Sequence, residues 1–213
     1  MKVTISIGGR FPTPFRLAEF LEQEGCLERI ITFTPKFRLR PLAVRDNHLI
    51  TIPWLGFVNY GIQRFSFFNN SRAELGYWTS ELFERSVLKH LGSCDVFNGW
   101  SNISLRSICQ AKAQGAVTVL NTGSAHIAYQ KELVEAEYAK FGLKRIVTDP
   151  RTVEKATQEF LEADHIIVAS TFVMRTLLDK GIKRSKISIV PDAVTRRFQT
   201  QPKQDSVFRI LAV

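Results

Sequence analysis

The chain has 213 residues, of which 45% are hydrophobic and 23% are charged, and this ordinary globular composition excludes a disordered, collagen-like or coiled-coil protein. It carries 29 Lys and Arg residues against 20 Asp and Glu residues, a formal charge of +9 that favours anionic partners. The 3 cysteines are widely spaced and form no CxxC pair, which predicts buried thiols in a reducing cytosol.

The first 52 residues predict three strands and one helix. Residues 3–7 form a β-branched run that is too short for a signal peptide and predicts a strand. A helical pattern begins at Pro12 and stops at Gly25, and strands are expected at 29–33 and 49–52. The longest uncharged run lies between Asp46 and Arg64, and its prolines, glycines and asparagines make it a poor membrane span.

The rest of the chain alternates helices and strands. Helices are expected at 73–91, 102–114, 125–141, 151–163 and 172–180, and strands at 95–97, 116–120, 165–169 and 186–190. This alternation predicts an α/β fold: a Rossmann-like, doubly wound, mostly parallel sheet with helices on both faces and right-handed crossovers. Ligands of such sheets bind beyond the carboxyl ends of the strands.

Three loops that follow strands contain glycine and lead into helices. Their notable residues are Gly8, Gly9 and Arg10, then Gly99 and Trp100, and finally Gly123, Ser124 and His126. The backbone N–H groups at the start of each following helix suit an anion, although such glycines also occur simply in tight turns. Dinucleotide and P-loop signatures, metal-ligand spacing and a G-x-S-x-G elbow are absent from the sequence, so we expect no NAD and no metal.

His126 is expected in the first turn of a helix at the carboxyl edge of a strand. A helix N-terminus disfavours the imidazolium form, so a neutral, hydrogen-bonding ring is expected there. A purely structural histidine is the alternative.

Residues 29–72 hold seven basic side chains against one acid, Asp46, with six phenylalanines, Trp54 and Tyr60 among them. Aromatic and basic residues together bind nucleic acid or seat a protein on an anionic bilayer. They can also be an apolar core with a solvated basic face. No RNA-binding, zinc-finger or helix-turn-helix signature is present, so nucleic acid is not an expected partner.

Three segments carry a family resemblance. Residues 159–173 resemble the stretch E-x-x-x-A-D-x-I-x-V-x-S-x-x-V of GT-B glycosyltransferases of family 4, in which Ser170 is also a good helix N-cap. Residues 181–198 are similar to that family's G-v-x-x-x-K-I-x-V-[IV]-P-N-G-V-D-x-x-x-F, with Asp192-Ala193 in place of Asn-Gly. Residues 121–126 with Glu137-Tyr138 resemble its R-G-S-x-H-I … E-E-Y variant, and 208–213 resemble the first strand of its C-terminal domain.

The resemblance implies an acceptor-side N-terminal domain at 1–200, followed at 201–213 by a linker and the first strand of an absent C-terminal domain. It implies a hexosyltransferase that moves a sugar, with retention, from a nucleotide sugar to a hydroxyl of a glycan or lipid-linked acceptor, without a metal or other cofactor. The isolated chain would be inactive. A cytoplasmic location follows, with contact at the inner face of the membrane through residues 29–72 as a further expectation.

The resemblance also implies roles for the loop residues. The amides of Gly8 and Gly9 would lie near the diphosphate, and Arg10 would hold a phosphate or an anionic acceptor group. His126 would bind the donor sugar or stabilise developing charge. Trp100 would stack on a sugar ring, unless it packs in the core. The remaining substrate-binding candidates are Gly99, Gly123, Ser124 and Ser170. The alternative function is a non-catalytic fragment that binds anionic membranes or acidic partners.

Overall fold

The computed structural model describes residues 1–9, 12–40, 42–65, 71–143 and 146–191. Within this part, seven strands form one sheet in the order β3-β2-β1-β4-β5-β6-β7. The strands are β1 (Val3–Ile7), β2 (Leu27–Thr32), β3 (Leu49–Thr51), β4 (Val96–Trp100), β5 (Val117–Thr122), β6 (His165–Val168) and β7 (Ile187–Ile189). Every neighbouring pair is parallel, which confirms the predicted Rossmann-like α/β class.

The helices connect the strands as crossovers. They are α1 (Pro12–Gln23), α2 (Lys36–Leu39), α3 (Pro53–Arg64), α4 (Arg72–His90), α5 (Leu105–Ala113), α6 (Ile127–Lys140), α7 (Pro150–Glu162) and α8 (Thr171–Asp179), with a 3-10 turn at Arg184–Lys186. The predicted glycine stops are confirmed, for example at Gly25 (φ 67°) and Gly142 (φ 70°), where the left-handed backbone ends a helix.

Two helices, α2 and α3, were not expected from the sequence. In α3, only Leu55 and Ile62 are fully buried, yet Trp54, Phe57 and Val58 on other positions are apolar too. These exposed apolar residues widen the apolar side of α3 beyond the part that is buried, so its buried stripe does not stand out from the sequence. Two glycines inside it lower the helix propensity further.

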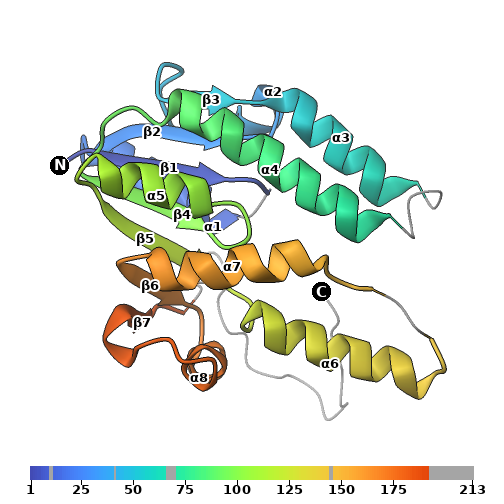
Figure 1. The fold of residues 1–213 in the computed structure, drawn as a ribbon. Helices are drawn as coiled ribbons and strands as arrows, with labels where there is room; N and C mark the ends of the chain where they lie inside the picture. Colours follow the sequence, from blue (N-terminus) through green and yellow to red (C-terminus); the bar gives the residue numbers. More distant parts are fainter. Residues whose placement is uncertain (10–11, 41, 66–70, 144–145, 192–213) are drawn as a thin grey trace, which may run out of the picture.

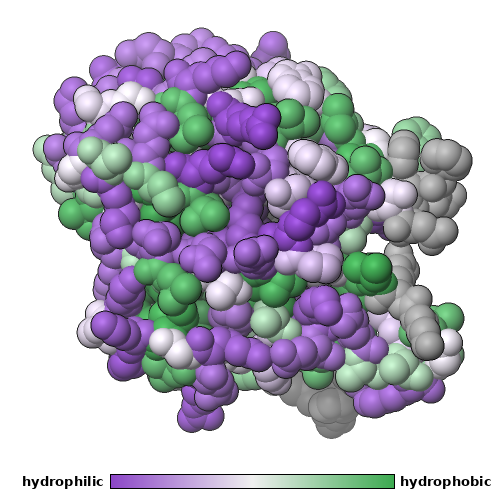
Figure 2. Space-filling view, viewed as in Figure 1, coloured by the Kyte–Doolittle hydropathy of each residue, from purple (hydrophilic) through white to green (hydrophobic). Residues whose placement is uncertain are grey.

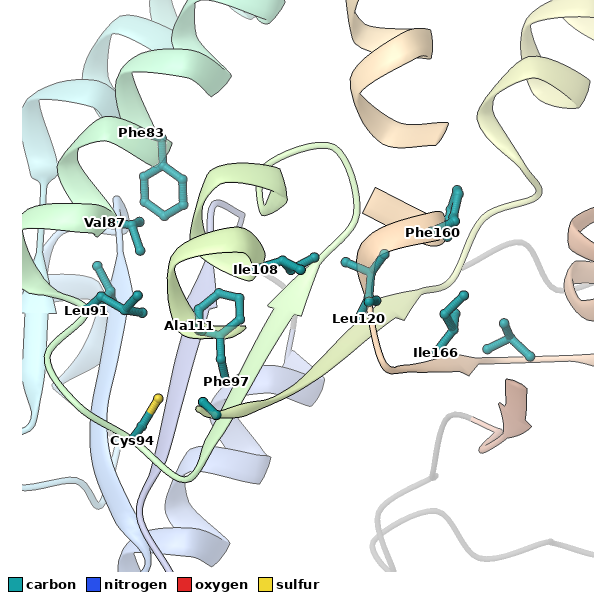
Figure 3. Close-up of a cluster of buried hydrophobic side chains, with 14 of the residues drawn as sticks. Phe83, Val87, Leu91, Cys94, Phe97, Ile108, Ala111, Leu120, Phe160 and Ile166 are labelled. Carbon is teal, nitrogen blue, oxygen red and sulfur yellow. The ribbon is translucent and has the colours of Figure 1, made fainter. Parts of the chain in front are cut away.

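The core lies on both faces of the sheet. On one face, Ile5 of β1 packs with Phe15 and Ala18 of α1. On the other, Phe97 of β4 and Leu120 of β5 pack with side chains from α4, α5, α7 and α8 (Figure 3). Figure 1 shows α4, α5 and α7 in front of the sheet, and it shows α3, α4 and α6 extending past the carboxyl ends of the strands. These extensions flank the edge at which a ligand would bind.

The structure contradicts one expectation about the cysteines, and other expectations concern residues outside the described part of the chain. Cys94 is buried, but Cys26 is only partly so and Cys109 is exposed, so the prediction of three buried thiols is wrong. Arg10 and the predicted linker and strand at 201–213 lie outside the described residues. Among the helices that the structure describes, none combines the length and hydrophobicity that a membrane crossing needs.

Candidate functional site

The strand order places a topological switch point between β1 and β4. The chain proceeds from β1 to β2 on one side and from β4 to β5 on the other, so the loops after β1 and β4 leave the sheet edge on opposite faces. Gly8 is buried in the loop after β1. A Cβ atom there would come within 2.8 Å of the Phe33 ring and 2.9 Å of Ile103 Cδ1. Side chains that follow β2 and β4 therefore close on the first glycine loop.

The loop after β4 is tightly packed as well. A Cβ on Gly99 would come within 2.5 Å of the Ser104 hydroxyl oxygen, and that hydroxyl donates to the carbonyl of Trp100 at 2.7 Å. Trp100 is partly buried and packs against the cluster on the α1 face. Asn102 has a positive φ of 78°, which turns the chain towards α5.

The N-terminus of α5 is filled by the protein's own carboxylates. Glu159 of α7 accepts hydrogen bonds from the backbone N–H groups of Asn102 (2.6 Å), Ser104 (2.6 Å) and Leu105 (3.1 Å). Glu84 of α4 accepts one from the N–H of Arg106 at 2.7 Å. The expectation that this helix start is free for an external anion is therefore wrong, because internal acceptors already use its donors.

The two carboxylates belong to a buried charge network. Lys155 Nζ lies 2.5 Å from Glu84 Oε1 and 3.1 Å from Glu81 Oε1, and Arg106 contacts Glu81 at 2.8 Å. Burial and the neighbouring Glu84 raise the pKa of Glu159 to about 8, against the N–H groups that favour its ionised form. Three carboxyl groups and only two basic side chains meet in this network. One carboxyl group therefore keeps its proton at pH values well above the ordinary pKa of a glutamate.

His126 caps the start of α6 and is 1% exposed. Its ring lies 5.3 Å from the Phe160 ring of α7, measured between centroids, and its backbone N–H donates to Thr176 of α8 at 3.0 Å. Three elements thus hold it directly after β5. The prediction of a histidine at this helix start is confirmed.

The ring of His126 has a defined polarity. Nδ1 accepts the backbone N–H of Ala128 at 3.2 Å, so the neutral ring carries its proton on Nε2. Burial, and secondarily Lys180, lower its pKa, which keeps the ring neutral. The buried Nε2 finds no hydrogen-bond partner among the described residues. The arrangement leaves one buried ring N–H donor without a partner in the described part of the chain.

The remaining candidates lie along the same edge. Gly123 and Ser124 are exposed after β5, and Ser170 follows β6, where its hydroxyl accepts the N–H of Val173 at 3.3 Å and caps α8. Neighbouring strands lie about 5 Å apart. The loops after β1, β4, β5 and β6 therefore follow consecutive positions of one sheet edge.

A hollow lies on the outer face, between α4, α5 and α7, away from the loops at the sheet edge. Its volume is 650 Å³, and Figure 2 shows hydrophilic residues over this part of the surface. Its cations are paired internally: Arg106 with Glu81, and Arg151 with Asp149 at 2.8 Å. Within the described ranges, no three His, Cys, Asp or Glu side chains gather closely enough to hold a metal ion.

Sequence reasoning did not assign a role to Glu84, Lys155 or Glu159. Charged residues on helices ordinarily face solvent, and their burial depends on how α4, α5 and α7 pack. The one available signal was the first position of the motif at 159–173, which is Glu159.

No protein-family model matches the chain, and no curated protein matches it either. Among solved structures, the UDP-GlcNAc 2-epimerase from Methanocaldococcus jannaschii matches with a TM-score of 0.50 and 14% identity, over 89% of this chain and 45% of its own. A UDP-glucosyltransferase from Polygonum tinctorium matches 92% of this chain and 54% of its own, with a TM-score of 0.44 and 12% identity. LpCGTa, solved with UDP, also matches 92% of this chain and 54% of its own, with a TM-score of 0.48 and 13% identity.

The chain shares the fold of the matching part of the epimerase. At this identity the likeness concerns the fold alone, a parallel Rossmann-like sheet with helices. The chain spans about half the length of these solved structures.

Proposed function

We propose that the chain is the N-terminal, acceptor-side domain of a GT-B glycosyltransferase of family 4, which transfers a hexose from a nucleotide sugar to an acceptor hydroxyl with retention. The acceptor is a glycan or a lipid-linked hydroxyl. The motif at 159–173 supports the family, and the parallel sheet with a switch point between β1 and β4 supports a ligand edge. A second domain would bind most of the nucleotide.

The observation that carries the proposal is the unpartnered, buried Nε2–H of His126. A buried donor without a partner is costly in a folded protein unless a ligand satisfies it. Because the ring stays neutral, it can donate to a sugar hydroxyl without repelling a cationic transition state. Such a fixed donor stabilises the transition state more than it stabilises the substrate.

The other residues have matching roles. The loop amides of Gly8 and Gly9 face the departing diphosphate, whose oxygen takes the acceptor hydroxyl's proton on the same face of the sugar. The N-terminus of α5 takes no part, because Glu159 and Glu84 occupy it. Glu159 instead holds the loop that follows Trp100, and Trp100 then presents its exposed portion to the acceptor.

The test uses a longer protein, read from the open reading frame past the codon for Val213. We expect it to hydrolyse or transfer from one of a panel of UDP-, GDP- and ADP-sugars. His126→Ala should lower kcat by about 100-fold or more, the loss typical of removing a transition-state hydrogen-bond donor.

His165→Gln is the matched control, because His165 contacts Ser188 rather than the loop after β5. Its kcat should stay near that of the wild type. A longer protein that binds no nucleotide sugar, or one in which His126→Ala is fully active, contradicts the proposal.

A further inference from the structure

Helix α3 presents apolar side chains to solvent. Trp54, Phe57 and Val58 are 52%, 60% and 46% exposed, and Phe65, directly after the helix, is 60% exposed. We call these four residues the α3 face. The spacing i, i+3 and i+4 of Trp54, Phe57 and Val58 places them on one side of the helix, next to the side that buries Leu55 and Ile62. Phe65 follows the last turn in extended backbone. Figure 2 shows hydrophobic residues along this helix.

The stretch of sequence around the α3 face is basic. The sequence contains no acid between Asp46 and Glu74, while Arg64 is exposed in the last turn of α3. Helix α2 adds Lys36 and Arg38, both exposed.

One contact ties this basic surface to α3. A Cβ on Gly56 would run into the carbonyl oxygen of Phe33, so the chain leading into α2 lies against α3. The Arg38 guanidinium lies 5.7 Å from the centre of the Phe37 ring, and that ring is itself 58% exposed. Exposed aromatic rings and cations thus occur on both α2 and α3.

The structure also separates this surface from the rest of the basic stretch at 29–72. Arg29 donates to the carbonyl of His90 at 2.7 Å, and Arg45 pairs with Glu22. These two cations hold the fold together, so the full stretch does not form one patch.

We propose that the α3 face docks on an anionic lipid surface, with its aromatic side chains in the interface and Lys36, Arg38 and Arg64 at the head groups. Aromatic rings favour the boundary between head groups and acyl chains, and each nearby cation is attracted to anionic lipid. A second copy of the chain is a poorer occupant, because both copies would bring the same cations together. The docking needs no catalysis and is independent of the proposed transferase.

The experiment is sedimentation of the full chain with phosphatidylcholine vesicles, with and without about one-third phosphatidylglycerol, at low and high salt. We expect binding to the anionic vesicles only, weakened by salt. Trp54→Gln with Phe57→Gln should lower the partition coefficient by about tenfold or more, since it removes two exposed rings from the interface. Phe20→Gln with Leu161→Gln, which removes apolar groups of 57% and 49% exposure elsewhere, should change it little.

A second pair of variants tests the charge. Arg38→Gln with Arg64→Gln should reduce binding far more than Arg85→Gln with Lys89→Gln, which removes the same charge from exposed positions on α4. Circular dichroism checks that every variant is folded. Absence of binding to anionic vesicles overturns the proposal, as does an equal loss in both charge variants, which would indicate diffuse attraction. A dimer in sedimentation velocity that the Trp54 and Phe57 changes dissociate also overturns it, by assigning the face to a second copy.

Discussion

His126 is surrounded by groups that favour its neutral form. Burial removes water from the ring, and Lys180 adds positive charge nearby, so its pKa in the folded protein is lowered from 6.5. In the unfolded chain the same ring takes up a proton near its ordinary pKa. The folded state therefore binds fewer protons than the unfolded state just below pH 6.5.

We expect the free energy of unfolding to fall as pH drops below about 6.5, by at most about 1.4 kcal/mol per pH unit from this group. His126→Asn keeps an N-cap acceptor for Ala128 but does not titrate, so it should lose this part of the pH dependence. Urea unfolding of both proteins between about pH 7.5 and pH 5 is the measurement. If the free energies of unfolding of the two proteins changed in parallel with pH, the lowered pKa of His126 would be contradicted.

Glu159 titrates in the opposite sense. Its pKa is raised to about 8 in the folded protein, so the folded state holds a proton that the unfolded state releases above pH 4.5. Its stabilising contribution is complete below pH 4.5 and is lost as pH rises through about 8. Each pKa unit corresponds to about 1.4 kcal/mol.

Glu159→Gln should be less stable than wild type at low pH, by about 1–3 kcal/mol, because its amide NH2 replaces one carboxyl oxygen and meets either the N–H of Asn102 or those of Ser104 and Leu105. The difference should shrink as pH rises towards 8. Glu162→Gln, on the exposed side of the same helix, is the control and should follow wild type throughout. Denaturant unfolding across this pH range is the measurement. A difference in the free energy of unfolding between Glu159→Gln and wild type that stays constant with pH would contradict the raised pKa.

The position of His126 could be predicted from the sequence, whereas the position and partners of Glu159 could not. His126 follows a strand and a glycine loop, so its place at a helix start could be deduced locally. The partners of Glu159 lie 54 to 57 residues away, and only the packing of α7 on α5 brings them together. Local patterns do not contain that information.

At the scale of elements, the turn from β4 into α5 depends on close approach. Gly99 faces the Ser104 side chain so closely that no Cβ fits without moving it. Gly76 of α4 has nothing within 4 Å of the position where a Cβ would stand. The two glycines are thus a matched pair, one constrained by packing and one not.

Gly99→Ala should lower the free energy of unfolding by about 1–3 kcal/mol, the usual effect of overpacking. Gly76→Ala should be neutral or raise it by about 0.5–1 kcal/mol, because alanine loses less backbone entropy in a helix. Chemical denaturation of the two variants beside wild type tests this. Equal changes in the free energy of unfolding would mean that the Ser104 side chain can move aside at no cost.

Helix α3 shows where element prediction reached its limit. The stops at Gly25 and Gly142 were visible because a single residue type causes them. In α3 the periodicity was hidden by apolar residues on the solvent side. The same exposed residues form the α3 face, so the feature that concealed the helix is the one that suggests a partner.

At the scale of the whole molecule, the alternation of strands and helices was enough to predict a parallel sheet. The strand order was not, because the long crossover from β3 to β4 passes two strands before the chain rejoins β1. That crossover, through α3 and α4, creates the switch point. The position of the candidate site therefore depends on a connection that local patterns do not specify.

The same architecture predicts a hierarchy of stability. β1, β4 and β5 lie inside the sheet and pack in the two clusters, so their amides should exchange with solvent only on global unfolding. Helix α6 buries no residue completely and extends past the sheet, so its amides should exchange through local opening. Hydrogen exchange followed by mass spectrometry should show α6 deuterated well before β4. Anionic vesicles should then protect peptides from α3 and leave α6 unchanged, which separates docking of the α3 face from a general stabilisation. Equal protection of α6 and β4 in the free chain would contradict the hierarchy.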